Sequence, residues 1–466
     1  MSVLFNVLNI ARHALLANQK ALAITSQNIA NVNTKGYARQ EVVFGAFATA
    51  NGEVPTDHQG ALGMGVLISD VRRAGGGMNT VLEERIAAGE SNLGRLRARD
   101  GLFNRIESIL NDASATGLNR VMSDFFNAAS DLSAVLPGGD DAAQRAVLLE
   151  RARALARRFV STDTRLNEVD SDIDAEVTRL LREVNAQTAQ IAHLNDLIAT
   201  ATSSGQQTNE LRNQRRLLLN DLAEKIGFTS VEDPLNLGKI TLTIDSLTGA
   251  SPTALVQAGT NQILSTTRPL TEADITANLK SGRLAGLANM RDVVLPAFKA
   301  DLDLLASRLV AEVNSRHSVG FNTAGVTGLP LFSGTTAGTM GVAVTAPEGI
   351  AASSVAGLPG DNQIMRNIVT LQNTLVVPEG TPTDTLQNFY NSVIARLGAE
   401  AQDATSNLSA ENAIQDELVS LRDTNSGVSL DNELINVVKY QRAFEAAARL
   451  VTVTDEMLLT LINLKR

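Results

Sequence analysis

Residues 4–29 read LFNVLNIARHALLANQKALAITSQNI, and this stretch decides how the rest of the chain is interpreted. Apolar residues return at alternating steps of four and three, the spacing of a seam along one face of an α-helix. The seam positions are Leu4, Leu8, Ala11, Leu15, Asn18, Leu22, Thr25 and Ile29. The pattern predicts one long amphipathic helix, which ends where asparagines and Gly36 favour a turn.

The other end of the chain has the same rhythm. Ser426-Gly427 forms a break before it, and Asp431 and Glu433 fall in the first turns, where the helix dipole favours carboxylates. The seam positions are Leu430, Leu434, Val437, Gln441, Phe444, Ala448, Val451, Asp455, Leu458 and Ile462. We therefore predict a terminal coiled-coil domain over residues 1–40 and 426–466. Such a stripe commonly faces its own core, but long, narrow seams at both ends also favour assembly with neighbouring chains.

Proline placement separates these helical flanks from the middle of the chain. Nine of the 11 prolines lie between Pro234 and Pro382, and proline is poorly tolerated inside helices. Residues 90–226 predict a helical block, with its clearest seam from Ile173 to Ile198, a turn at residues 202–205 and a further helix over Asn209–Ile226. Helices are also expected over Ala297–Arg316 and residues 388–424.

The fold class expected is mainly α, with a small antiparallel β domain inserted in the middle. Lys239–Asp245 alternates as a strand does, and Ala254–Gln257 and Gln262–Thr267 could pair with it. A hairpin around Asn51-Gly52 is expected within residues 40–73, and residues 320–382 are expected to be loop or weak strand. The predicted domains are a hairpin and hinge linker (41–89), a helical bundle (90–230, 285–320 and 385–425) and the β domain (231–284 with parts of 321–384).

Composition excludes several classes of function. The chain has 466 residues, a net charge of −10 and no cysteine, so disulfides, thiol nucleophiles and zinc ribbons are excluded, and nucleic acid is disfavoured as a partner. No run of apolar residues is long enough to span a membrane. The N-terminus lacks the basic and apolar regions of a Sec-type signal peptide.

The sequence offers no convincing catalytic, metal or cofactor site. The four histidines (His13, His58, His193 and His317) are scattered and not at ligand spacing. Asp140-Asp141 could be an acid/base pair, but a helix N-terminal cap is the better interpretation. The arginines between Arg151 and Arg158 favour a solvated helix face over an anion site. No enzyme and no cofactor are expected.

Two motifs resemble a known group of proteins. Residues 28–39, NIANVNTKGYAR, resemble the N-terminal signature of bacterial flagellar rod, hook and hook-associated proteins. Residues 426–431, SGVSLD, continuing through 438–444, VKYQRAF, resemble the C-terminal signature of the same group. The motifs and seams together give the expected assembly interface. Its N-terminal residues are Leu4, Leu8, Leu15, Leu22, Asn28, Asn31, Asn33, Thr34, Gly36, Tyr37 and Arg39. Its C-terminal residues are Gly427, Leu430, Asp431, Leu434, Val437, Tyr440, Gln441, Phe444, Val451, Leu458 and Ile462.

The middle of the chain is similar to hook-associated protein 1. Rod and hook proteins of the same group have β-rich middles, whereas this chain has a large helical block. Residues 140–148, 191–198, 209–215 and 298–332 carry this similarity. Members of the family often have a large β insertion after the segment matching Phe332. Here about 50 residues separate Phe332 from the next expected helix, so the outermost domain is expected to be absent or reduced.

The resemblance implies a structural role without catalysis. Such a protein would form a ring of its own copies at the extracellular hook–filament junction, between hook protein and hook-associated protein 3. It would be exported through the flagellar type III apparatus without a cleaved signal peptide, with a chaperone at its C-terminal helix. Three alternatives stay open. The first is a rod or hook component, and the second is an enzyme that acts on the cell wall or a glycan during assembly, which would need two carboxylates in a cleft. The third is a secreted helical effector that shares the export route.

Overall fold

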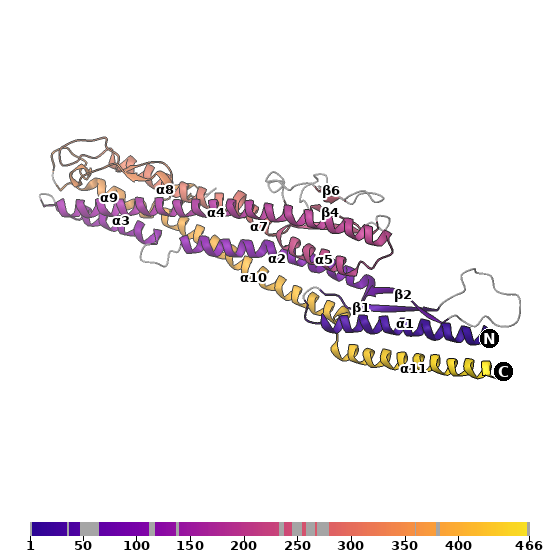
Figure 1. Cartoon of the computed structure of the whole chain (residues 1–466). Coiled ribbons are helices and arrows are strands. Elements are labelled where there is room, and N and C mark those ends of the chain that lie inside the picture. Colours follow the sequence, from indigo (N-terminus) through magenta and orange to yellow (C-terminus); the bar gives the residue numbers. More distant parts are fainter. Residues whose placement is uncertain are drawn as a thin grey trace.

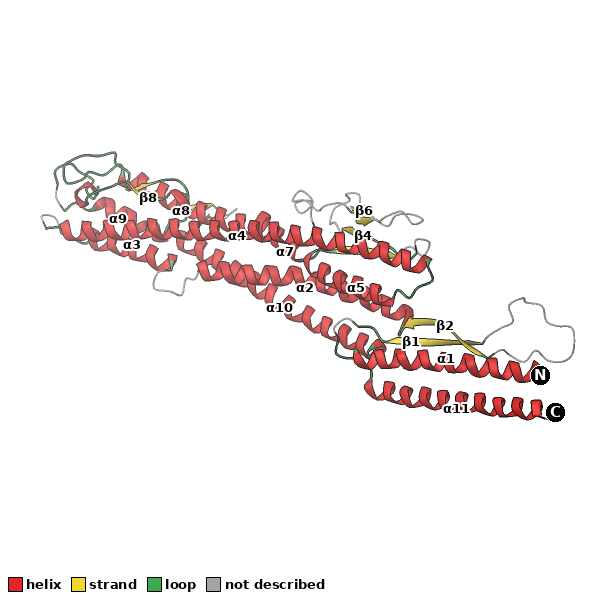
Figure 2. Cartoon of the chain, in the orientation of Figure 1, coloured by secondary structure: helices red, strands yellow, loops and turns green. Residues whose placement is uncertain are grey.

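The computed structural model describes residues 2–34, 37–46, 65–110, 117–136, 139–232, 237–244, 254–257, 266–267, 279–358, 360–378 and 383–463. The molecule is elongated, and both chain ends lie at the same end of it (Figure 1). Helices make up most of its length, and strands occur in small antiparallel sheets along its sides (Figure 2). The expected fold class, mainly α with a small β domain, is confirmed.

The two ends of the chain form an antiparallel helical pair. Helix α1 (Ser2–Ala30) packs along α11 (Leu430–Asn463), as the seams at the two ends predict. A hairpin of β1 (Gln40–Ala46) and β2 (Val66–Arg73) lies beside α1, in register from Gln40↔Arg73 to Ala46↔Val66. The turn expected at Asn51-Gly52 lies outside the described residues. Together α1, α11 and the hairpin are called the terminal module below.

The helical block is built around one very long helix. Helix α4 (Ala142–Ser203) has 62 residues and extends well beyond the seam predicted from Ile173 to Ile198. Helix α5 (Asn209–Lys225) returns beside it after the expected turn at residues 202–205. Helices α2 (Gly76–Leu110), α3 (Leu118–Ser133) and α10 (Leu386–Ser426) complete the block, with α2 against α10 and α3 against α4.

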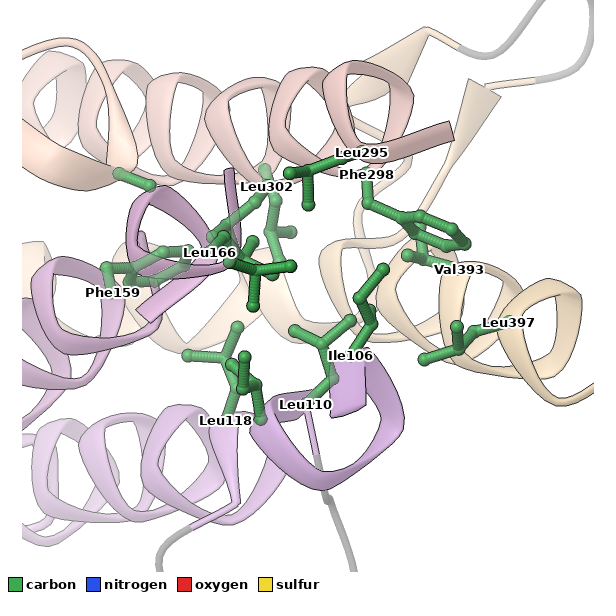
Figure 3. Packing of buried hydrophobic residues seen from close by; sticks show 14 of the residues in the cluster. Ile106, Leu110, Leu118, Phe159, Leu166, Leu295, Phe298, Leu302, Val393 and Leu397 are labelled. Atoms are coloured by element: carbon green, nitrogen blue, oxygen red, sulfur yellow. The ribbon is translucent and has the colours of Figure 1, made fainter. Parts of the chain in front are cut away.

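A long helical segment made of three consecutive elements packs against this block. It consists of α7 (Arg283–Asn289), a π-helical turn η2 (Met290–Val294) and α8 (Leu295–His317). Pro296 lies at the start of α8, where its missing N–H is tolerated. Figure 3 shows where this helix meets α2, α3, α4 and α10 in the core. The labelled residues there are Ile106, Leu110, Leu118, Phe159, Leu166, Leu295, Phe298, Leu302, Val393 and Leu397.

The main sheet has four antiparallel strands in the order β3-β4-β5-β6. They are β3 (Phe228–Glu232), β4 (Ile240–Ile244), β5 (Ala254–Gln257) and β6 (Thr266–Thr267). The sequence missed β3, because FTSVE directly follows a helical pattern and leaves most of its side chains exposed. Of the expected strand over Gln262–Thr267, residues 262–265 lie outside the described residues.

Residues 320–382 contain more structure than the sequence suggested. The interval includes short strands β7 (Phe332–Ser333), β8 (Gly341–Val342) and β9 (Val377–Pro378), which pairs with β10 (Thr383–Asp384). It also contains the 3-10 turns η3 (Ala337–Thr339), η4 (Pro347–Gly349) and η5 (Thr370–Asn373). Helix α9 (Gln363–Val369) buries Ile364, Met365 and Ile368 against α3 and α8. The expectation of about 50 residues without a helix after Phe332 is therefore wrong, since so short a helix gives little periodic signal.

The domain boundaries remain a proposal, and several of them fall inside elements of the structure, among them β1, α2, β3, α7 and α10. The interval 41–89 holds the hairpin but also the first turns of α2, which begins at Gly76. The β domain proposed from residue 231 begins inside β3. Among the described residues, no helix is long and apolar enough to cross a membrane.

Candidate functional site at the paired chain ends

Asn28, in the last turn of α1, uses all of its side-chain hydrogen-bonding capacity. Its Oδ1 accepts hydrogen bonds from the Tyr37 hydroxyl at 2.9 Å and the Gln40 backbone N–H at 3.0 Å. Its Nδ2 donates to the Gln40 carbonyl at 2.9 Å and to Glu433 Oε2 at 3.2 Å. Asn28 thereby fixes the start of β1 against the end of α1, and ties both to α11.

Glu433 is the residue of α11 at the centre of this network. It is only 1% exposed and accepts a second hydrogen bond, at 2.7 Å, from Arg39 Nε. Burial alone would lower the pKa of Arg39, but the hydrogen bond and charge of Glu433, together with Glu41, raise it above its ordinary value. The buried carboxylate is thus paired and hydrogen-bonded, as a charge in this position must be. The sequence placed Glu433 only near the helix dipole, and no seam position indicated that it is buried.

Two tyrosines border the same network. Burial, aided by the negative charges of Glu210 and Glu433, raises the pKa of Tyr37 to about 12. Burial and then Glu433 also raise the pKa of Tyr440. The Tyr440 ring lies 6.0 Å, centre to centre, from that of Phe44 on β1. Both phenols therefore stay protonated at neutral pH, with Tyr37 as a donor to Asn28.

The turn after α1 is held by its own polar residues. Asn31 Nδ2 donates to the Gln27 carbonyl, and the Thr34 hydroxyl donates to Asn31 Oδ1 at 3.1 Å. The Tyr37 N–H then bonds to the Thr34 carbonyl, which carries the chain from α1 toward β1. Asn33 is exposed. Gly36 lies outside the described residues.

Residue 427, just before α11, has no room for a side chain and is a glycine. A Cβ on this residue would lie 2.3 Å from the Asp423 carbonyl oxygen, which accepts the Gly427 N–H at 2.8 Å. The contact lets α10 end and α11 begin within a few residues. Asp431 is exposed in the first turn of α11, near the positive end of the helix dipole.

The predicted seam of α1 is partly buried within the chain. Leu4, Leu8, Leu15 and Leu22 are half-buried, and Ala11 and Thr25 between them are buried. Alanines fill further positions of the contact, because Ala17 and Ala21 are also buried. This face is therefore built from small side chains that let α1 approach its neighbours closely.

The predicted seam of α11 is only half right within the chain. In one predicted row Val437, Val451 and Leu458 are half-buried and Phe444 is exposed. The second row in the structure is Glu433, Tyr440, Ala447 and Thr454. The row expected instead is displaced by one position, and its residues Leu434, Gln441, Asp455 and Ile462 are exposed. Both rows have heptad spacing, and the buried row contains a carboxylate, a phenol and a hydroxyl. The hydrophobic periodicity of the sequence therefore could not indicate that this row is the buried one.

An apolar surface remains uncovered on α11. Exposed fractions reach 65% for Ile435, 54% for Leu434 and 59% for Ile462. Further exposed apolar residues on this helix are Leu430, Val438, Leu450, Val453, Met457, Leu459 and Leu461. So many on one helix are unusual for an isolated surface and typical of an interface.

The residues considered for catalysis have structural roles. Asp140 Oδ1 accepts the Ala142 N–H at 3.1 Å at the start of α4, while Asp141 pairs with the buried Arg145 at 2.8 Å. The N-cap position of α4 is occupied by Asp141, whose side chain makes this ion pair and no capping hydrogen bond, while Asp140 binds the first N–H of the helix from the residue before the cap. Arg153 binds Glu150 and the Thr345 carbonyl. In the described part of the chain, no three His, Asp or Glu side chains are grouped to hold a metal ion.

Comparison with known families accounts for both ends and the middle of the chain. Residues 8–37 match the model of the flagella basal body rod protein, and residues 423–464 match the C-terminal model of the flagellar basal body rod FlgEFG proteins. The paired ends thus define a flagellar axial protein, a structural component of the flagellum that associates with other axial components. Residues 103–332 match the helical domain of flagellar hook-associated protein FlgK.

Relatives along the whole chain agree with this assignment. Flagellar hook-associated protein 1 of Bacillus subtilis (strain 168) is 28% identical over 509 residues, which cover 99% of each chain. The protein of that name from Escherichia coli (strain K12) is 27% identical, over 70% of this chain and 60% of its own length. The chain is thus similar to flagellar hook-associated protein 1 along its whole length. In fold it resembles a flagellar hook junction protein from Burkholderia pseudomallei, with a TM-score of 0.57 and 13% identity over 74% of this chain and 100% of that one.

Proposed function

We propose that this protein forms the junction between hook and filament on the outside of the cell, as a ring of its own copies. Hook protein would lie on one side of the ring and hook-associated protein 3 on the other. The role is structural, without catalysis or cofactor. Export would use the flagellar type III apparatus without a cleaved signal peptide, and a cytoplasmic chaperone would hold the C-terminal helix.

The observation that carries this proposal is the terminal helical pair with one face left open. The Asn28–Glu433–Arg39 network fixes how α1 and α11 lie against each other. The same arrangement leaves Leu434, Ile435 and Val438 exposed on α11. An apolar face held in a defined orientation is suited to helices of neighbouring copies or of other axial proteins.

The proposal is tested by deleting the gene and examining the cells by electron microscopy, with an immunoblot for flagellin in the medium. Hooks without filaments, together with secreted flagellin monomer, are expected. Complementation with the full chain should restore filaments, whereas a chain lacking residues 431–466 should not. Normal filaments in the deletion strain would contradict the junction role and favour the effector. Missing hooks would favour a rod or hook component.

A further inference from the structure

A second polar site lies where the terminal module meets the helical block. A pocket with a volume of about 210 Å³ is bounded by the end of β2 and by α2, α5 and β3. Four arginines line it: Arg73 is the last residue of β2, and Arg212, Arg215 and Arg216 belong to α5. The pocket is separate from the network around Asn28 and Glu433, and the family signatures at the chain ends do not include it.

The charges that line this pocket do not balance. Four guanidinium groups face three carboxylates, those of Glu83, Glu84 and Glu232, which leaves one positive charge in excess among the described lining residues. Glu83 is shared between Arg73, at 2.9 Å, and Arg216. Glu232 is shared in the same way between two other arginines, Arg212 at 2.8 Å and Arg215 at 3.3 Å. Two carboxylates therefore serve four cations.

The arginines destabilise one another's charged forms. Burial lowers the pKa of Arg73, and the positive charges of Arg216 and Arg212 lower it further, against the pull of Glu83. Burial likewise lowers the pKa of Arg215 to about 10, with Arg212 and Arg73 adding to the effect and Glu232 opposing it. The described lining of the pocket thus carries one positive charge in excess, in a chain whose net charge is −10.

One buried donor of an arginine that lines the pocket has no acceptor among the described residues. Arg73 Nε is buried and has no hydrogen-bond partner in the part of the chain that the structure describes. A buried N–H without an acceptor is unfavourable, and a cationic one more so. An oxyanion would supply the acceptor and the negative charge together, since guanidinium groups bind such anions through paired N–H donors.

We propose that this pocket binds one small tetrahedral oxyanion, of the phosphate or sulfate class, between Arg73 and the arginines of α5. Arg73 belongs to the hairpin of the terminal module, whereas Arg212 and Arg216 belong to the helical block. The bound anion would fasten the two parts to each other at a point where Asn209 Nδ2 already bonds to the Val71 carbonyl at 2.9 Å. The orientation of the terminal module would then depend on anion concentration.

The test uses the purified full-length chain and inorganic phosphate as the probe. Isothermal titration calorimetry near neutral pH, with ionic strength held constant by chloride, should give a saturable isotherm at one phosphate per chain. R73Q and R212Q should each weaken phosphate binding roughly tenfold or more, because each removes a charged donor. The melting temperature in phosphate minus that in chloride should rise for the wild type and not for these variants.

R179Q is the matched control. Arg179 is an exposed arginine of α4 that pairs with Glu176 and Glu183 and does not line the pocket. This control variant should bind phosphate as the wild type does. The quantity compared is the difference in melting temperature between phosphate and chloride for each variant. A variant with a lower melting temperature in chloride therefore still tests the proposal. A wild type without saturable binding, or R73Q and R212Q with unchanged affinity, would overturn the proposal and leave the cluster as an ion-pair network only.

Discussion

Glu433 shows what a single residue contributes to the terminal module. Its carboxylate joins Arg39, the residue before β1, with Asn28, in the last turn of α1. Removing it would leave both donors facing a space with no acceptor, and an unpaired buried polar group is more costly than a hydrogen bond is favourable.

We predict that Glu433→Ala lowers the free energy of opening the α1–α11 pair by roughly 1–3 kcal/mol. Hydrogen exchange should speed up in α1 and α11 while α4 keeps its protection, since the block has its own core. Glu456→Gln, a change to an exposed carboxylate on the same helix, is the control and should leave exchange unchanged. Equal exchange in Glu433→Ala and wild type would show that the network does not hold the pair.

We expect His317 to make the stability of the helical block depend on pH. It is fully buried, with Nδ1 at 2.8 Å from the Leu329 carbonyl and Nε2 accepting the Ala351 N–H at 2.8 Å. Burial lowers its pKa, and the nearby charge of Arg145 adds to this, although the bond to Leu329 opposes it. The folded state therefore prefers the neutral imidazole.

The sign of the pH effect follows from that preference. Below the ordinary histidine pKa of about 6.5 the unfolded chain takes up a proton that the folded chain resists, so stability falls as pH falls through this value. The urea midpoint should be lower at about pH 5.5 than at about pH 7.5. In His317→Gln this difference should shrink, whereas the exposed His193→Gln should keep it. An unchanged difference in His317→Gln would assign the effect to other groups.

At the scale of elements, glycines decide how closely helices can approach. On Gly286 of α7 a Cβ would lie 2.5 Å from the Arg95 carbonyl oxygen and 2.9 Å from Ala98 Cβ, both on α2. On Gly101, also in α2, a Cβ would meet nothing within 4 Å. Glycine therefore allows close helix packing at residue 286, whereas at residue 101 it has no packing role.

Alanine substitutions at these two glycines should have opposite effects. Gly286→Ala should lower the free energy of unfolding by about 1–3 kcal/mol, because α7 must move away from α2. Gly101→Ala should raise it by roughly 0.5–1 kcal/mol, since alanine loses less backbone entropy in a helix. Thermal denaturation of both variants beside the wild type measures the difference. Destabilisation by Gly101→Ala, or none by Gly286→Ala, would contradict this account of the α2–α7 contact.

The elements differ in how far the sequence could predict them. Long helices with strong apolar seams, such as α1 and α4, were predictable because each turn repeats the same signal. The five-residue β3 and seven-residue α9 were not, since their conformations depend on neighbours distant in sequence. Within the site, the motif pointed to Asn28, Tyr37 and Arg39. The motif could not reveal Glu433 as their partner. In the sequence a carboxylate in the first turns of a helix indicates a solvent-facing residue, and only the tertiary contact with Arg39 shows that this one is buried.

For the whole molecule, the two faces of α11 can be separated by mutation. Val451 flanks the contact with α1, whereas Leu434 is 54% exposed in the single chain. Leu434→Asp should leave melting and hydrogen exchange near wild-type values but abolish filament assembly in a complemented deletion strain, by placing a charge on the open face. Val451→Asp should impair both. Normal filaments with Leu434→Asp would mean that this face is not used in assembly.

The pairing of the chain ends also constrains how the molecule is made. Asn28 and Glu433 are 405 residues apart in sequence, so this contact is among the least local in the fold and costly in loop closure. At ordinary translation speeds, roughly 20 to 80 s pass between synthesis of the two residues. The part of the helical block that precedes α10 can begin to fold in that interval, but α1 has to wait for α11. The order of synthesis therefore makes the terminal module the last part of the molecule that can fold, and the part most easily kept open until the chain reaches its place.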